Sequence, residues 1–333
     1  MNYNYEKLGT GEKECYNEIV KASKKLQRMV TLPGKYSLDD VSKILIAVAY
    51  DCPGLFYVNF NRLKIFQMPS QTELEMSYLY DVENIPDMKK RVNDSLKLML
   101  KAIDIKDTDT DLVKCKKIHD YMVKNVVYDH AAVGHAEEYF EAYTIAGVFY
   151  KKRAVCEGVS KAFKFLCDRL KVDGAVIIGD SLLNSDSGNS GHAWNAVRID
   201  GEYFHMDITW DMCMSGQCRV NRYDYFLIPD GWINTDHKSE WPGKCSSIVN
   251  SYFYRTGKYI ENMAHLEKYL NDRIFVKKKK IIYFRYKGKC DEQTAKSIMD
   301  TISKNIRLLG RTGTFYFWNN ENQNVFFVNL NEY

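Results

Sequence analysis

"GHAWNAVRIDGEYFHMDITWD", residues 191–211, predicts a β-hairpin near the middle of this 333-residue chain. Asp200 and Gly201 lie between two runs of alternating residues, which is the strongest short-range signal for a two-residue type I′ turn. With these two residues as the loop, Ile199 lies opposite Glu202, and every other cross-strand pair follows from that register. The turn therefore determines which side chains share a face of the hairpin.

Four side chains that an ordinary hairpin does not need fall on one of its faces. The register places Trp194 opposite Asp207 and His192 opposite Thr209, so all four point to the same side. His192 and Asp207 are diagonal neighbours, about 7–8 Å apart at the backbone, a separation that an imidazole–carboxylate hydrogen bond can close. His205 shares this face but has no acid at its diagonals, and we interpret it as a structural histidine.

Apolar residues at helical spacing in residues 152–172 predict a buried helix that begins near residue 155. Cys156 falls in its first turn, where the free N–H groups and the helix dipole favour a thiolate. The thiolate is the form of cysteine that attacks a carbonyl carbon. The alternative is that Cys156 is a small core residue, which is our interpretation of Cys167 within the same helix.

The chain on either side of these motifs predicts two smaller units. We expect an N-terminal α+β unit over 1–105, a core over 106–245 and a C-terminal β-α-β-β unit over 250–333. Alternating and helical patterns in the first part predict helices over 12–28, from Ser37 onward, over 86–103 and over 109–125, and strands within 55–68 and 73–82. The same patterns in the last part predict a strand within 279–288, a helix over 291–310 ended by Gly310, and a hairpin over 312–330.

The overall composition is that of a globular protein with a mild charge. Lys and Arg number 47 against 43 Asp and Glu, for a net charge of +4, which does not argue for nucleic acid or an anionic membrane as a partner. No apolar run approaches the roughly 20 residues that span a bilayer, and the first residues lack the apolar stretch of a signal peptide. We expect a cytoplasmic location; the alternative is a secreted or surface-exposed protein whose leader has been removed.

The cysteines and acidic runs predict neither a cofactor nor a metal. Nine scattered cysteines, an odd number in a long chain, favour reduced thiols, and the absence of any C-x-x-C pair argues against a zinc ribbon. "DTDTD" at 107–111 has Leu112 and Ile118 where a calcium-binding EF-hand needs glycine and glutamate. We expect these acids to cap the helix that follows.

Three segments together resemble the motifs of the transglutaminase-like superfamily: "VCEGVSKAF" at 155–163, "GHAWNAV" at 191–197 and "YFHMDITWD" at 203–211. The segments at 117–129, 142–158 and 223–232, and His237, are similar to those of its bacterial members. The resemblance is strong over about 110–240. It implies an α+β fold with a papain-like core, in which the nucleophile helix packs on an antiparallel sheet and small α+β units flank it.

The resemblance also implies roles for the residues that match the motifs. Cys156 would be the nucleophile, His192 the base and later the acid, and Asp207 the group that orients the imidazole. The backbone N–H of Cys156 would help to form the oxyanion hole, with Tyr143 as a candidate second donor. Trp194 and Trp210 would line the cleft, although both could be plain core aromatics.

We therefore expect a cysteine-dependent amide hydrolase or acyl transferase that acts on a peptide or protein substrate through a thioester. The alternative is a non-catalytic scaffold that uses the fold for binding. The zinc pairs of peptide N-glycanases and the calcium sites of animal transglutaminases have no counterpart in this sequence, so a calcium-regulated crosslinker is not supported. Whether water or an amine accepts the acyl group, and the oligomeric state, are left open by the sequence.

Overall fold

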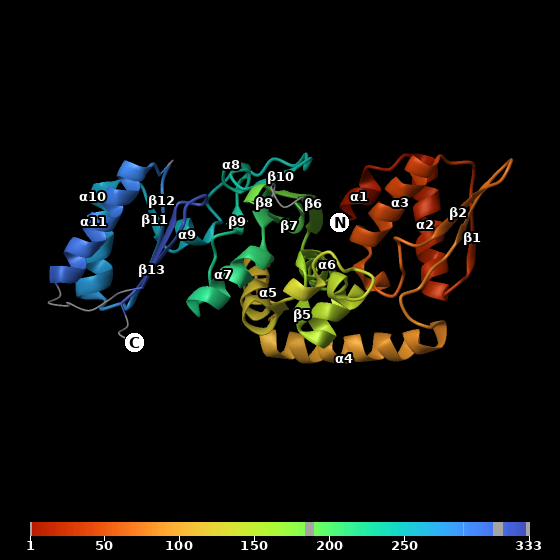
Figure 1. Cartoon of the computed structure of the whole chain (residues 1–333), viewed down its shortest axis with the longest axis horizontal. Coiled ribbons are helices and arrows are strands. Elements are labelled where there is room, and N and C mark those ends of the chain that lie inside the picture. The colour runs from red at the N-terminus through yellow and green to blue at the C-terminus, as the bar shows by residue number, and fades with distance from the viewer. Residues whose placement is uncertain (1, 184–189, 289, 309–315, 331–333) are drawn as a thin grey trace.

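The computed structural model describes residues 2–183, 190–288, 290–308 and 316–330. Figure 1 shows an elongated α+β molecule with the elements from Tyr3 to Glu75 at one end, the predicted hairpin in the middle and its last residues at the other end. The long helix α4 lies beneath the first two of these parts. Among the helices of the described residues, none is long and apolar enough to cross a membrane.

The N-terminal part is a helical layer beside a small sheet with the strand order β1-β3-β2. Its elements are α1 (Tyr3–Glu6), α2 (Thr10–Lys25), β1 (Met29–Leu32), α3 (Leu38–Asp51), η1 (Pro53–Leu55), β2 (Lys64–Gln67) and β3 (Thr72–Glu75). Ser37 caps α3 as predicted, because its hydroxyl accepts a hydrogen bond from the N–H of Asp40.

Two expectations for this part were wrong in detail. The first helix ends at Lys25, because Leu26 takes a left-handed conformation, and the unpredicted strand β1 follows. Only Lys64–Gln67 of the strand expected within 55–68 forms, since the chain first makes a 3₁₀ turn at Pro53–Leu55.

The middle part contains a five-stranded sheet, with the order β10-β6-β7-β8-β9 and antiparallel pairing throughout. Its strands are β6 (Gly174–Ser181), β7 (Gly191–Ile199), β8 (Glu202–Met206), β9 (Phe226–Ile228) and β10 (His237–Ser239), and β4 (Val127–Tyr128) pairs separately with β5 (Arg153–Ala154). Its helices are η2 (Val82–Asn84), α4 (Ile85–Ile103), α5 (Asp111–Asn125), η3 (His130–Ala132), η4 (Phe140–Tyr143), η5 (Gly147–Lys151), α6 (Cys156–Arg169), α7 (Ile208–Cys218) and α8 (Asp230–Ile233).

Helix α6 packs on strands β6 and β7, as the resemblance implied. Val159, Phe163 and Leu166 bury its apolar face. A polar link fixes the same contact, because the Nδ2 of Asn195 donates to the carbonyl oxygen of Ser160 at 3.0 Å. The start of α6 is thereby held against the sheet that carries His192.

The C-terminal part has the predicted β-α-β-β order, with additional elements before it. They are α9 (Tyr252–Arg255), β11 (Tyr259–Ile260), α10 (Met263–Asn271), η7 (Asp272–Val276), β12 (Ile281–Tyr286), α11 (Glu292–Leu308), β13 (Tyr316–Asn320) and β14 (Val325–Asn329). The predicted helix end at Gly310 and the first residues of the hairpin lie outside the described residues. The sheet order is β11-β12-β14-β13. Apolar side chains of α10, α11 and this sheet form a core of their own.

Candidate active site

The hairpin β7–β8 has the register that its sequence predicts. Ile199 pairs with Glu202, and Asn195 pairs with Met206. The strand then ends at Met206, so the expectation that it runs on through Thr209 was wrong. Asp207 is instead the N-cap of α7, where its Oδ1 accepts a hydrogen bond from the N–H of Trp210 at 3.0 Å. An aspartate satisfies the free N–H groups of a helix start, and the chain leaves the sheet there.

His192 and Asp207 nevertheless meet. The Nε2 of His192 lies 2.7 Å from the Oδ2 of Asp207, and both side chains are buried. Because Asp207 stands at the junction of strand and helix, one of its oxygens caps α7 while the other faces the histidine. The carboxylate is thus fixed by the backbone on one side and by the imidazole on the other.

Cys156 is the first residue of α6, half-buried, and it lines the same cavity as His192. The Nε2 of His192 is bonded to Asp207, so its Nδ1 is the nitrogen that remains for the cysteine. As the first residue of the helix, Cys156 also has a backbone N–H without an intrahelical acceptor. The imidazole of His192 therefore lies between the thiol of Cys156 and the carboxylate of Asp207.

The electrostatics of the pair favour an ionised arrangement. Burial acts to lower the pKa of His192, but the charge of Asp207 and hydrogen bonds with Asp207 and Cys156 raise it from 6.5 to about 10. Burial likewise acts to raise the pKa of Asp207, yet the two histidines beside it, His192 and His237, hold it well below its usual range. The imidazole is therefore an imidazolium at neutral pH when it faces a thiolate and a carboxylate.

His237, the first residue of β10, is a second histidine on the same carboxylate. Its Nε2 lies 3.0 Å from the Oδ2 of Asp207, and its Nδ1 lies 2.7 Å from the Oδ1 of Asp236. The sequence assigned no role to it, because 30 residues separate it from Asp207 and no periodicity relates the two. Its place in a segment that resembles the family was the one signal available.

His192, Asp207 and His237 also offer atoms of the type that binds a metal ion. Their nitrogen–oxygen contacts of 2.7 and 3.0 Å are direct and have the length of hydrogen bonds. The geometry is that of a hydrogen-bonded acid–base group.

The three other predicted site residues differ in where they lie. Trp194 is buried behind His192, with ring centroids 5.8 Å apart, and its Nε1 donates to the Nδ1 of His205. Trp210 lines the cavity, with its ring centroid 5.7 Å from that of His192. Tyr143 also lines the cavity, but its hydroxyl donates to the carbonyl oxygen of Ala132 at 2.7 Å. An oxyanion role for Tyr143 would need that bond to break.

Gly158, in the first turn of α6, allows the helix start to approach the preceding chain closely. A Cβ at this position would lie 2.2 Å from the carbonyl oxygen of Ala142 and 3.1 Å from that of Thr144. The carbonyl oxygen of Ala142 also accepts a hydrogen bond from the N–H of Val155 at 3.1 Å. The glycine two residues after Cys156 is thus required by the contact with η4 that places Cys156.

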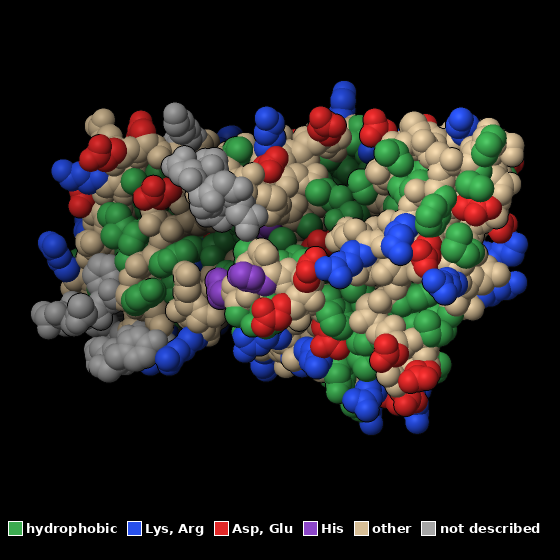
Figure 2. All heavy atoms as spheres, turned by 45° about the vertical axis from the view of Figure 1, so that its right-hand side comes forward, with side chains coloured by type: hydrophobic (Ala, Val, Ile, Leu, Met, Phe, Trp, Pro, Cys, Tyr) green, Lys and Arg blue, Asp and Glu red, His purple; other side chains and the backbone are tan. Residues whose placement is uncertain are grey.

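The cavity around Cys156 has a volume of about 1020 Å³ and draws its walls from all three parts of the chain. Tyr50 comes from α3, Tyr128 and Cys213 come from the middle part, and Trp318–Glu321 come from β13 and the turn after it. None of these residues was predicted from the sequence. On the face in Figure 2, basic and acidic side chains are interspersed and hydrophobic side chains gather in a hollow near the middle, so this face offers no extended area of one charge.

Comparison with known proteins shows what the part of the chain that contains this site is similar to. Residues 101–208 match the model of the transglutaminase-like superfamily. Kyphoscoliosis peptidase of Homo sapiens is 26% identical over 184 residues, which cover 49% of this chain and 28% of the relative. The protein of the same name from Mus musculus is 23% identical over the same shares. The chain therefore spans 28% of the length of these relatives. A solved structure described as a TGase is 14% identical, with a TM-score of 0.32, and the match covers 53% of this chain and 48% of that one.

Proposed function

Because residues 101–208 match the model of the transglutaminase-like superfamily, we propose that this chain is a cysteine-dependent enzyme that cleaves or transfers peptide-like amides. The observation that carries the proposal is one arrangement of three side chains. His192 is bonded at 2.7 Å to the buried Asp207, and its other ring nitrogen is left for Cys156 at the start of α6, in the wall of an open cavity.

The first half of the reaction forms a thioester. The thiolate of Cys156 attacks the amide carbon, and the carbonyl oxygen becomes an oxyanion as the C–O π bond opens. Collapse of this intermediate breaks the C–N bond, and the imidazolium of His192 gives its proton to the leaving amine. Asp207 keeps Nε2 as a donor throughout, so that the proton exchanged by the histidine stands on Nδ1.

The second half releases the acyl group. Neutral His192 takes a proton from water or from a primary amine as that nucleophile attacks the thioester. The thiolate leaves and is again paired with the imidazolium. Water gives hydrolysis or deamidation, and an amine gives acyl transfer.

Two donors are needed for a well-formed oxyanion hole. The N–H of Cys156 is the first. Tyr128 is better suited than Tyr143 to be the second, because it lines the cavity and its hydroxyl has no partner among the described residues. Burial and the charges of Cys156, Cys213 and Asp207 raise the pKa of Tyr128, so it keeps its proton for donation.

Incubation of the full chain with a glutamine-containing protein and a labelled primary amine, read by mass spectrometry, tests the proposal. Incorporation of the amine means transfer, conversion of glutamine to glutamate means deamidation, and new chain ends mean proteolysis. Cys156→Ala should abolish all three, whereas Cys290→Ser, which removes another half-buried thiol, should leave them unchanged. A protein that turns over no amide, and whose Cys156→Ala variant still retains a binding partner, would be a scaffold instead.

A further inference from the structure

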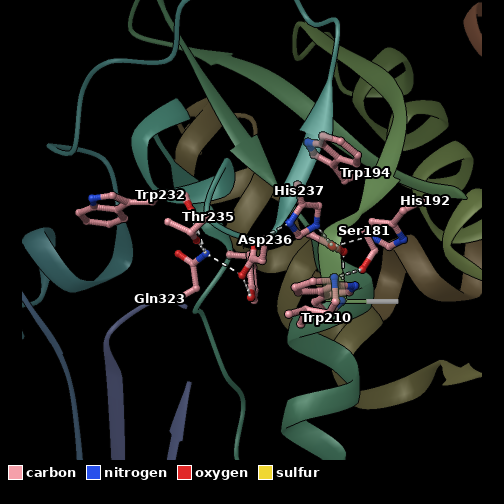
Figure 3. A network of polar contacts seen from close by, with 12 residues as sticks. Ser181, His192, Trp194, Trp210, Trp232, Thr235, Asp236, His237 and Gln323 are labelled. Carbon is pink, nitrogen blue, oxygen red and sulfur yellow. Dashed lines mark hydrogen bonds and ion pairs between the residues drawn. The ribbon is translucent and has the colours of Figure 1, made fainter. Parts of the chain in front are cut away.

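A network of buried polar groups connects the C-terminal part of the chain to the proposed triad. Figure 3 shows Gln323 at one end, Asp236 and His237 in the middle and His192 at the other end. Each contact in this series is a hydrogen bond between side chains. Gln323 lies in the turn between β13 and β14, Asp236 and His237 lie at the start of β10, and His192 and Asp207 lie in β7 and at the N-cap of α7.

Gln323 is the contribution of the C-terminal part. Its Nε2 donates to the Oδ2 of Asp236 at 3.0 Å and also lies within 3.0 Å of acceptors on Trp232 and Thr235. Its Oε1 accepts from the guanidinium of Arg285 at 3.0 Å. Arginine can only donate, so this contact fixes which end of the amide faces Asp236.

Asp236 connects Gln323 to His237 by hydrogen bonds to both side chains. Its Oδ2 accepts from Gln323 and from the hydroxyl of Tyr225, at 2.6 Å, while its Oδ1 faces the Nδ1 of His237 at 2.7 Å. The side chain is fully buried. With three partners around it, the carboxylate has no freedom to rotate away from the histidine.

The ring of His237 is held on both edges. Carboxylate oxygens accept hydrogen bonds, and each ring nitrogen faces one: Asp236 beside Nδ1 and Asp207 beside Nε2. A flip of the ring would turn C–H groups toward both carboxylates. Its other ring neighbours are Trp210, Trp194, Tyr225 and His192, with ring centroids 4.2 to 5.6 Å away.

We propose that the C-terminal part of the chain positions the triad, with Gln323 and His237 as its positioning residues. Gln323 holds Asp236, Asp236 holds the ring of His237, and His237 holds Asp207 from the side opposite to His192. This inference rests on the proposed function, because it assigns a role to groups that act on the proposed triad.

The C-terminal part is anchored firmly enough for this role. The Nδ2 of Asn320 donates to Asp224 at 3.1 Å and to the hydroxyl of Tyr225 at 3.2 Å. Arg222 is buried, bonded to Asp224 at 2.8 Å, and packed against the ring of Trp318 at 4.2 Å. The hairpin that carries Gln323 is therefore bonded to the same segment, residues 222–225, that leads into β9.

Alkylation of Cys156 by iodoacetamide, followed from pH 5 to 10 on the full chain, tests this role without a substrate. Gln323→Met keeps the volume of the side chain and removes its hydrogen bonds. We expect about a tenfold slower reaction at pH 7 and a shifted pH profile, since a lost hydrogen bond to a charged group alters the equilibrium by about that factor. Asn322→Ala, at the preceding position of the same turn, is the matched control and should react like the wild type.

Two further variants separate positioning from folding. His237→Gln places an amide donor near the position of Nε2 and should keep more of the reaction rate than His237→Leu, although both cut the link to Asp236. A Gln323→Met protein with the wild-type pH profile overturns the inference, whatever its melting temperature. An unreactive Cys156 in the wild type would instead overturn the proposed function, so the two failures are distinguishable.

Discussion

Replacement of Asp207 by asparagine should abolish activity while leaving the fold in place. Asp207 accepts from three donors: the Nε2 of His192, the Nε2 of His237 and the N–H of Trp210. Asparagine caps a helix as well as aspartate does, so its oxygen can keep the bond to Trp210 and preserve the start of α7. Its amide nitrogen then faces the two histidines, and a donor stands where both imidazoles need an acceptor.

The size of the loss follows from the tautomer of His192. To accept from the new amide, Nε2 must give up its proton, and Nδ1 then carries the hydrogen toward Cys156 and cannot take the thiol proton. An orienting aspartate changed to asparagine costs about 10⁴-fold in turnover where this inversion has been analysed in another enzyme. The charge of Asp207 also helps to raise the pKa of His192 to about 10, and that support disappears with it.

The assay is the rate of alkylation of Cys156 at pH 7, together with amide turnover and the melting temperature. Asp230→Asn is the matched control, because Asp230 makes the same kind of contact with His205, at 2.8 Å, outside the proposed triad. We expect Asp207→Asn to lose both reactions and Asp230→Asn to keep them. An Asp207→Asn protein whose Cys156 is alkylated within about threefold of the wild-type rate would refute the assignment of Asp207 as the orienting acid.

Two other changes test the packing and the charge of the site. Gly158→Ala forces a Cβ to within 2.2 Å of the carbonyl oxygen of Ala142 and should lower the free energy of unfolding by about 1–3 kcal/mol. The control Gly216→Ala, in open space within α7, should raise the free energy of unfolding by up to about 1 kcal/mol. Chemical denaturation measures both, and an unaltered stability of Gly158→Ala would contradict the close contact. The pKa of His192 is raised from 6.5 to about 10, so its stabilising contribution is fully present below pH 6.5 and is lost as the pH rises through 10. The difference in melting temperature between the wild type and His192→Gln should accordingly shrink between pH 6.5 and 10, and a difference that stays constant would speak against the ion pair.

The central hairpin shows how far local patterns lead. Asp200 and Gly201 gave the correct register, and the helical spacing around Cys156 gave the correct helix start. The extension of this register through Thr209 was wrong, although Ile208, Thr209 and Trp210 favour strands by propensity. N-capping by Asp207 outweighed their strand propensity, since a helix start has free N–H groups to satisfy. The meeting of His192 with Asp207 was still predicted, because Asp207 lies where the two structures join.

The rest of the site depends on contacts that no local pattern records. His237 reaches Asp207 only after two helices, α7 and α8, and the strand β9 between them have brought β10 to the far edge of the sheet. Gln323 reaches Asp236 across 87 residues, through packing between the middle sheet and the C-terminal sheet. In the sequence Gln323 is one polar residue of a turn among others, and only the assembled structure distinguishes it from Asn322.

The distribution of the cavity wall along the chain has a consequence for the order in which the protein acquires reactivity. A ribosome releases the chain from its N-terminus, so Cys156, His192 and Asp207 emerge well before Trp318–Glu321 and Gln323. A nascent chain therefore holds the three reacting groups before the turn that braces them exists. On the mechanism proposed above, full reactivity arrives only after residues 318–323 have emerged, when the parts that precede them have already had time to fold.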